Sequence, residues 1–258
     1  MPIHPTAVID SEAKIDASAE IGPFCVIGAD VVIGARTRLL ANIFAEGPLD
    51  IGEDNIFYPF STVGVAPQDL KYKGERSRTR IGNRNRIREF VTIHRGTEGG
   101  GMVTEIGDDN LVMAYTHIAH DVLVGSHTVL ANGVTFGGHV VVEDWSVIGA
   151  WSGVHQFCRI GKHAMIGGYS VITKDVMPYS MVSVEREAKV YGANKTGLER
   201  RGFSPASIDA LHKAFRVLTK SGLNTTQAVD QINEDGPHTP EIDDLLAFIA
   251  RSERGIVK

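Results

Sequence analysis

The sequence predicts a mainly β protein in which short strands coil into a solenoid, followed by a small C-terminal domain of α-helices. Three observations support this prediction. A six-residue apolar repeat runs from Ile9 to Ile172, glycine or a small polar residue often follows the repeated position, and the repeat gives way to a tail with helical periodicity.

The repeat keeps one residue of every six aliphatic or aromatic, with two changes of phase and with Ala45 as its weakest member. A period of six fits neither a helix nor an ordinary amphipathic strand, so the chain must return to one interior at regular steps. Three hexads, about eighteen residues, would form one triangular coil, and stacked coils would bury an aliphatic column while pairing their backbones in parallel. We expect the glycine after the apolar residue, as in Ile21-Gly22, to form the corners. The repeated residues are Ile9, Ile15, Ile21, Ile27, Ile33, Leu39, Ala45, Ile51, Phe57, Val63, Ile81, Ile87, Ile93, Ile106, Val112, Ile118, Val124, Leu130, Phe136, Val142, Ile148, Val154, Ile160, Ile166 and Ile172.

Composition agrees with a cytoplasmic, enzyme-sized protein. The chain has 258 residues, 43% of them hydrophobic, which is enough for one long core and a small appended domain. A formal net charge of −5 argues against bulk nucleic-acid binding. Neither end has an apolar run that suits a signal peptide or a membrane span, and two cysteines, Cys25 and Cys158, suit a reducing compartment.

Two segments break the repeat, residues 65–80 and residues 95–105. Insertions in a solenoid commonly lie on its binding face, so we expect functional residues beside them rather than two solvated loops. The first segment is dense in polar residues, including Gln68, Asp69 and Lys71. We place the solenoid with these loops at residues 1–180.

Residues 181–258 form the predicted helical domain. Ser204-Pro205 and Thr239-Pro240 each have the pattern of an N-cap followed by the first helical residue. The first of these helices carries one apolar stripe, with Ile208, Leu211, Phe215 and Leu218, and one basic row, with Lys213, Arg216 and Lys220. A basic row of this kind is usually only a solvated face.

Histidines gather in the central coils, and the intervals from His120 to His139 and from His139 to His155 are close to one coil. These three side chains should therefore stack near one edge, with Gln156 beside them. Such an edge would suit zinc, as in the hexapeptide-repeat carbonic anhydrases, or a general base that removes a proton from a substrate hydroxyl. His117 and His120 are three apart, which differs from the wider spacing in those anhydrases and argues against zinc.

Six segments, in order, carry a more specific resemblance. They resemble the UDP-N-acetylglucosamine O-acyltransferases, which catalyse the first step of lipid A biosynthesis, and the matches extend over nearly the entire chain. The resemblance implies a left-handed parallel β-helix, no cofactor, no metal and a homotrimer with active sites between adjacent coils. The segments are QDLKYKGE at 68–75, RNRIREFVTIHRGT at 84–97, THIAHD at 116–121, GGHVVVEDW at 137–145, GVHQFCRIGKHAMIGG at 153–168 and GLERRGF at 197–203.

The resemblance also implies roles for individual residues. His120 matches the base that deprotonates the sugar 3-hydroxyl as it attacks the thioester of a 3-hydroxyacyl acyl carrier protein, Asp121 matches the carboxylate that orients this histidine, and the Gly138 amide matches the oxyanion donor. Because strand alternation would point His120 and Asp121 apart, a direct pair requires a corner conformation.

Binding roles follow from the same resemblance. Gly168 matches the position that measures acyl length, and the absence of a side chain predicts a preference for longer chains. Independently of the resemblance, the positive charges of Lys213, Arg216 and Lys220 on a net-negative chain lead us to expect that this row steers the acidic carrier protein. The implied substrate-binding residues are Gln68, Asp69, Lys71, His94, His117, His139, His155, Gln156, Asn194, Arg200 and Arg201.

Two departures from the family pattern leave the acceptor open between UDP-GlcNAc and its 3-amino analogue. The segment from Ser183 to Glu187 is apparently one residue longer, and Thr196 replaces an acidic residue. Three other functions remain as alternatives. They are the N-acyltransferase of the same pathway, which usually has an additional N-terminal domain, a zinc carbonic anhydrase, and a non-catalytic β-solenoid scaffold. The last needs neither the histidines nor the QDLKYKGE segment.

Overall fold

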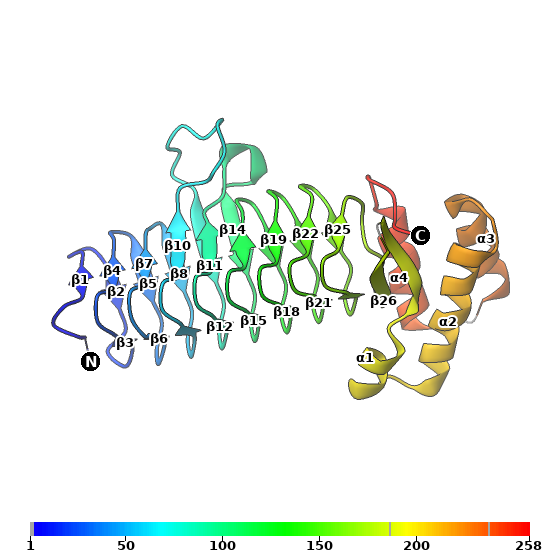
Figure 1. Ribbon diagram of the computed structural model, residues 1–258, viewed down its shortest axis with the longest axis horizontal. Coiled ribbons are helices and arrows are strands. Elements are labelled where there is room, and N and C mark those ends of the chain that lie inside the picture. Colours follow the sequence, from blue (N-terminus) through cyan, green and yellow to red (C-terminus); the bar gives the residue numbers. More distant parts are fainter. Residues whose placement is uncertain (1–2, 186, 237) are drawn as a thin grey trace.

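The computed structural model describes residues 3–185, 187–236 and 238–258, and shows a three-sided solenoid with helices at one end (Figure 1). Its strands form three sheets, one for each side of the coil. The first sheet contains β1 (Val8–Ile9), β4 (Val26–Ile27), β7 (Phe44–Ala45), β10 (Thr62–Val65), β13 (Thr92–His94), β16 (His117–Ile118), β19 (Thr135–Phe136), β22 (Gly153–Val154) and β25 (Val171–Ile172).

The second and third sheets complete each coil. The second contains β2 (Lys14–Ile15), β5 (Val31–Ile33), β8 (Leu49–Ile51), β11 (Arg78–Ile81), β14 (Val103–Ile106), β17 (Leu123–Val124), β20 (Val141–Val142) and β23 (Arg159–Ile160). The third contains β3 (Glu20–Ile21), β6 (Arg38–Leu39), β9 (Ile56–Phe57), β12 (Arg86–Ile87), β15 (Leu111–Val112), β18 (Val129–Leu130), β21 (Val147–Ile148), β24 (Met165–Ile166), β26 (Ser180–Glu185) and β27 (Glu187–Ala193).

The apolar repeat forms the core, as the sequence predicts. Neighbouring strands within the solenoid pair in parallel, so that Val8 lies opposite Val26 and His117 opposite Thr135. From Ile21 to Ile172 every repeated residue is buried, whereas Ile9 and Ile15 in the first coil are only partly covered. Each coil thus adds three apolar side chains to a continuous column.

The corners differ from the expectation that glycines form them. From Phe24 onward, the residue in the left-handed conformation at each regular corner is the third after the repeated one, and it is usually not glycine, as with Asp121 and His139. The glycine directly after the repeated residue instead allows neighbouring coils to approach. A Cβ on Gly22 would lie 1.7 Å from the carbonyl oxygen of Leu40, in the next coil.

A ladder of polar side chains runs through the interior behind one corner. The buried Asn55, Asn85 and Asn110 each donate from their side-chain amides to a backbone carbonyl, and the carboxamide oxygen of each accepts from the next coil. The Asn85 side chain donates to Gly107 O at 2.9 Å and to Asn55 Oδ1 at 3.0 Å. The ladder satisfies buried backbone groups that the short strands leave unpaired.

Two loops leave the solenoid on the same side, between the first and second sheets (Figure 1). The first loop connects β10 to β11, and the second connects β13 to β14 and contains the 3₁₀ helix η1 (Glu98–Gly100). The backbone N–H of Glu98 donates to Glu75 Oε1 at 3.4 Å, so the loops touch.

The C-terminal part begins with a hairpin that sequence analysis missed. Strand β26 continues the third sheet beside β24, and β27 returns antiparallel to it. The departure from the family pattern falls at the far end of this hairpin, where Glu185 pairs with Glu187; Arg186 lies outside the described residues.

The described residues after the hairpin form four helices: α1 (Lys195–Arg200), α2 (Pro205–Lys220), α3 (Thr225–Asp235) and α4 (Pro240–Ala250). The predicted caps are confirmed, because the Ser204 and Thr239 side chains accept from the third residue beyond them. Helices α1 and α3 were not predicted. In the described parts of the chain, no helix is long and apolar enough to span a membrane.

The asparagine ladder gives a test of the fold. Replacing Asn85 by alanine removes two donors and one acceptor, and should lower the free energy of unfolding by roughly 2–4 kcal/mol because buried partners lose their bonds. Calorimetric melting of both proteins measures this loss. The exposed Asn132→Ala is the control and should melt as the wild type does; an equal loss in both variants would contradict a special role for the ladder.

Candidate active site

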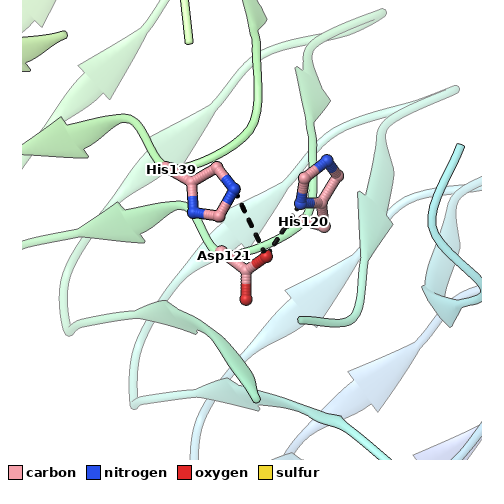
Figure 2. Close-up of side chains that lie close together, drawn as sticks. All are labelled: His120, Asp121 and His139. Carbon is pink, nitrogen blue, oxygen red and sulfur yellow. Dashed lines mark hydrogen bonds and ion pairs between the residues drawn. The ribbon is translucent and has the colours of Figure 1, made fainter. Parts of the chain in front are cut away.

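The strongest candidate site lies at the corner between β16 and β17, beneath the two loops. The His120 Nδ1 atom lies 2.8 Å from Asp121 Oδ2, and the Asp121 side chain is fully buried (Figure 2). Asp121 has a φ of 59°, which is the corner conformation that a direct pair requires. An ionised carboxylate can only accept hydrogen bonds, so this contact places the imidazole proton on Nδ1 and leaves Nε2 free to accept one.

Both carboxylate oxygens of Asp121 have further partners. The Thr97 hydroxyl donates to Oδ2 at 2.5 Å, and the Thr97 N–H donates to Oδ1 at 2.8 Å. The backbone N–H of Asp121 donates to the Thr104 hydroxyl at 2.8 Å. Three donors therefore hold the carboxylate: His120 Nδ1–H, the Thr97 hydroxyl and the Thr97 N–H. It has little freedom to rotate.

His139 faces the same carboxylate from the next coil. Its Nε2 lies 3.9 Å from Asp121 Oδ2, and its ring meets that of His120 edge to face, with centroids 5.2 Å apart (Figure 2). Burial lowers the pKa of His139, partly offset by the nearby carboxylates of Asp121 and Asp69. The residue stacked on His139 one coil further is Phe157 rather than the expected His155, at 4.4 Å between centroids.

Gly138 packs its backbone directly against the His120 ring. A Cβ there would lie 2.4 Å from His120 Cε1 and 2.7 Å from Nε2, so a side chain at this position would displace the imidazole. Among the described residues, the Gly138 N–H donates to no protein acceptor, whereas its carbonyl accepts from Phe157 N–H. The Gly138 backbone thus lies beside the His120 ring, close to Nε2.

His94 and His117 form a second histidine pair at this corner. Their rings meet edge to face at 4.9 Å, and His117 Nδ1 lies 2.7 Å from the Thr92 hydroxyl. Burial lowers the pKa of His94 to about 4 and also lowers that of His117, in both cases reinforced by neighbouring histidines. Both rings are therefore neutral near pH 7 and suited to hydrogen bonding.

The other residues predicted for this region are more exposed. Gln68, Asp69 and Lys71 lie in the first loop, where Asp69 Oδ1 accepts from the Lys71 N–H at 2.9 Å. His155 and Gln156 are exposed at the corner after β22, and His155 Nδ1 lies 3.1 Å from the Gln156 carbonyl oxygen.

A separate pocket of about 800 Å³ lies between the third sheet and α1. Asn194, Thr196, Arg200 and Arg201 all contribute to its walls, so the structure brings the predicted nucleotide residues together. The Asn194 side chain caps α1 and donates to the His163 carbonyl, whereas Arg200 is exposed. The hairpin contributes its base to this pocket, not the tip at 183–187.

Arg201 is fixed against the solenoid. Its guanidinium lies 5.4 Å from the centre of the Trp145 ring and donates to the Trp145 carbonyl at 3.2 Å. Trp145 belongs to a stack with His127, His163 and Tyr179 along one corner. This stack orients the arginine toward the pocket, and neither Trp145 nor His127 was singled out in the sequence.

The remaining predicted residues line neither the corner with His120 nor the pocket with Arg200 and Arg201. Gly168 is exposed at the corner between β24 and β25, and its φ is not in the left-handed range. Lys213, Arg216 and Lys220 line a small pocket of about 250 Å³ between α2 and β27. Lys213 is paired with Asp209 at 2.8 Å, which reduces its free charge.

The His120, Asp121 and His139 side chains also have the spacing of a metal site, because one ligand atom of each lies within 4.8 Å of the others. The hydrogen bonds of Asp121 indicate that it orients the His120 imidazole and does not bind a metal. Both oxygens of Asp121 are already occupied by donors, and Oδ2 accepts from His120 itself. A carboxylate held in this way orients an imidazole better than it ligates a metal.

Comparison with known proteins identifies the family. Residues 175–257 match the family described as UDP N-acetylglucosamine O-acyltransferase, domain 2, and residues 104–138 match six bacterial transferase hexapeptide repeats. The chain is 46% identical over 260 residues to the acyl-[acyl-carrier-protein]–UDP-N-acetylglucosamine O-acyltransferase of Burkholderia lata, covering 99% of each protein. It is 46% identical over 256 residues to the enzyme of that name from Xanthomonas campestris pv. campestris, covering 99% of this chain and 97% of the relative.

A solved structure agrees over the same length. The crystal structure of the UDP-N-acetylglucosamine O-acyltransferase of Moraxella catarrhalis matches with a TM-score of 0.94 and 45% identity, covering 100% of both chains. Sequence and structure thus agree from the first coil to the last helix, and this chain belongs to the UDP-N-acetylglucosamine O-acyltransferase family.

Proposed function

We propose that the chain transfers an (R)-3-hydroxyacyl group from acyl carrier protein to the glucosamine 3-hydroxyl of UDP-GlcNAc, with His120 as general base. The observation that carries the mechanism is the pairing of His120 Nδ1 with the buried Asp121 carboxylate, which leaves Nε2 free beside the Gly138 amide. Membership of the O-acyltransferase family favours this reaction over N-acyl transfer, carbonic anhydrase activity and a scaffold role.

In this mechanism His120 Nε2 takes the proton of the sugar hydroxyl as its oxygen attacks the thioester carbonyl. Asp121 stabilises the imidazolium that forms, since the Nδ1 proton already points at its carboxylate. The Gly138 N–H donates to the oxyanion of the tetrahedral intermediate. When the intermediate collapses, the carbon–sulfur bond breaks and the carrier thiolate takes the proton from His120, leaving an ester on the sugar.

Product mass spectrometry tests the reaction as a whole. The purified protein is incubated with UDP-GlcNAc or its 3-amino analogue and with carrier proteins bearing 3-hydroxyacyl chains of several lengths. An ester of UDP-GlcNAc is expected. Formation only of the amide would correct the acceptor, and no acylated sugar nucleotide with any donor would overturn the proposal.

His120→Ala is expected to assemble normally and lose roughly 10²–10⁴ in kcat, the usual contribution of a general base. His139→Ala should lose less and show part of the loss in KM, because His139 lies beside the carboxylate but is not bonded to it. Steady-state kinetics with both substrates measures this. Near-normal kcat in His120→Ala would remove His120 from the mechanism.

Each active site is proposed to form between two subunits of a homotrimer. The catalytic corner joins the first and second sheets, whereas the pocket with Arg200 and Arg201 lies against the third sheet, which is the opposite side of the triangular coil. The two regions of one chain therefore lie on different sides of the solenoid, and we assign the binding of one sugar nucleotide to regions of two subunits. A neighbouring subunit would bring its pocket to the corner.

Mixed trimers test this arrangement. His120→Ala and Arg201→Ala homotrimers should both be nearly inactive, whereas refolding an equal mixture should restore about a quarter of the sites, because a quarter of the interfaces join two intact halves. Activity is measured before and after mixing at constant total protein. Refolded single variants are the controls, and no gain in the mixture would place the site within one chain.

The acidic carrier protein is proposed to dock on the basic surface of α2. Arg216 and Lys220 are exposed, and among the described residues neither is paired with a carboxylate, unlike Lys213. The first loop adds the exposed Lys71 and Lys73 near the catalytic corner. These charges on a net-negative chain would orient the carrier as it approaches.

Gly168 is proposed to set acyl length, and Gly168→Met should shift the preference toward chains several carbons shorter. Each buried methylene contributes about 0.8 kcal/mol, so a blocking side chain discriminates lengths steeply. Rates with a panel of donors measure the shift, and the KM for UDP-GlcNAc should hardly change.

The control for this change is Gly168→Ala. A Cβ at this position would lie 3.0 Å from the Ala150 carbonyl oxygen, so alanine carries the local crowding without a long side chain. Alanine should keep the wild-type length preference. If alanine and methionine lower activity on every donor alike, together with the melting temperature, Gly168 is structural and does not measure length.

A further inference from the structure

The second loop, which connects β13 to β14, packs directly against the carboxylate of Asp121. Thr97 gives it two hydrogen bonds, one from the side chain at 2.5 Å and one from the backbone at 2.8 Å. Thr97 is buried, so its hydroxyl is directed away from solvent and toward the carboxylate. The contacts come from a segment 24 residues earlier in the chain.

Glycines let the loop close over the carboxylate. A Cβ on Gly100 would lie 2.0 Å from Asp121 Cγ and 2.3 Å from each of its oxygens, and a Cβ on Gly96 would lie 2.8 Å from Oδ1. Neither glycine has a φ in the left-handed range, so what excludes a side chain there is space and not backbone conformation. Gly99, in the same 3₁₀ turn, has nothing within 4 Å of a Cβ.

The loop itself is anchored to the solenoid and within its own turn. The Gly96 N–H donates to Arg78 O at 3.2 Å, while the N–H groups of Gly100 and Met102 both donate to Thr97 O, at 3.1 and 3.0 Å. Thr97 therefore sits at the centre of a closed turn. Because these hydrogen bonds fix Thr97, it can hold the Asp121 carboxylate in one orientation.

We propose that Gly96, Thr97 and Gly100 of the second loop form a clamp that positions Asp121, and that Thr97 is the positioning residue through which the loop acts on His120. The proposal rests on the proposed role of His120 and Asp121. Thr97 contacts neither sulfur nor sugar in this scheme; it fixes the carboxylate so that Oδ2 meets His120 Nδ1. Without it, the carboxylate is free to turn toward His139, whose Nε2 already lies 3.9 Å away.

Thr97→Val and Thr97→Ser form the first test. Valine keeps the shape but removes the hydroxyl, and should lower kcat about tenfold to a hundredfold, because small misplacements of a catalytic group have effects of this size. Serine keeps the donor and should restore most of kcat. The KM for UDP-GlcNAc should stay within about twofold in both. Equal activity of valine and serine variants would overturn the role of the hydroxyl.

Gly100→Ala and Gly99→Ala form the second test, which does not depend on Thr97. Alanine at 100 meets the Asp121 carboxylate and should lower kcat to a similar extent, whereas alanine at 99 meets nothing and should leave kcat and melting temperature unchanged. Equal effects of the two alanines would overturn the clamp.

A third measurement separates this proposal from the proposed function. In an Asp121→Ala parent, Thr97→Val should change kcat by less than about twofold, since its partner is gone. In NMR spectra, the low-field Nδ1–H signal of His120, assigned by its loss in His120→Ala, should persist in Thr97→Ser and shift or broaden in Thr97→Val. An unchanged signal in Thr97→Val overturns the clamp, even if His120 proves not to be the base. A near-normal kcat in Asp121→Ala would instead refute the catalytic pair.

Discussion

The corner conformation is the constraint on which the rest of the structure depends. A left-handed φ costs a non-glycine residue roughly 1–2 kcal/mol, yet the solenoid adopts it at the third position after the buried residue, coil after coil. Hydrogen bonds between coils repay this cost, as when the His139 N–H donates to the His120 carbonyl at 3.1 Å. The same conformation brings the side chains of two consecutive residues to one side, which an extended strand cannot do. The pairing of His120 with Asp121 is thus a local consequence of the coil.

Stacking the corners divides the surface into three columns of different character. One column begins with charged residues, such as Arg84 bonded to Asp109 at 2.8 Å, and continues as the aromatic stack that holds Arg201. A second carries the stacked, exposed rings of Phe60, Phe90 and Tyr115. The third carries the cluster of His120, Asp121 and His139 together with both loops. The candidate catalytic cluster and the pocket with Arg201 thus belong to different parts of the coil, which is why the proposed site draws on two subunits.

The sequence predicts the core almost completely, because one rule, an inward residue every six positions, repeats with few exceptions. It also predicts the individual residues of the site, but chiefly through the family resemblance. Spacing alone wrongly predicts that His155 stacks on His139. Corner residues stack only when they occupy the same position in consecutive coils, and the residue one coil after His139 is Phe157. Thr97 lies in the segment at 84–97 that carries the family resemblance, but the sequence does not predict its contact with Asp121. Its role depends on a loop closing onto a corner 24 residues away, which neither periodicity nor residue type reveals.

In the proposed mechanism either His120 or His139 could serve as the base, because both lie beside the Asp121 carboxylate, and their surroundings favour His120. Proton abstraction creates an imidazolium, so the better base is the ring whose charged form the site stabilises. His120 directs Nδ1 at Asp121 Oδ2 from 2.8 Å, and the imidazolium would keep this bond. His139 stands 3.9 Å from the same oxygen with Phe157 across its ring, and burial lowers its pKa. The charged form is disfavoured there, so His139 is better suited to meet the substrate as a neutral hydrogen-bonding group, while the clamped carboxylate supports His120.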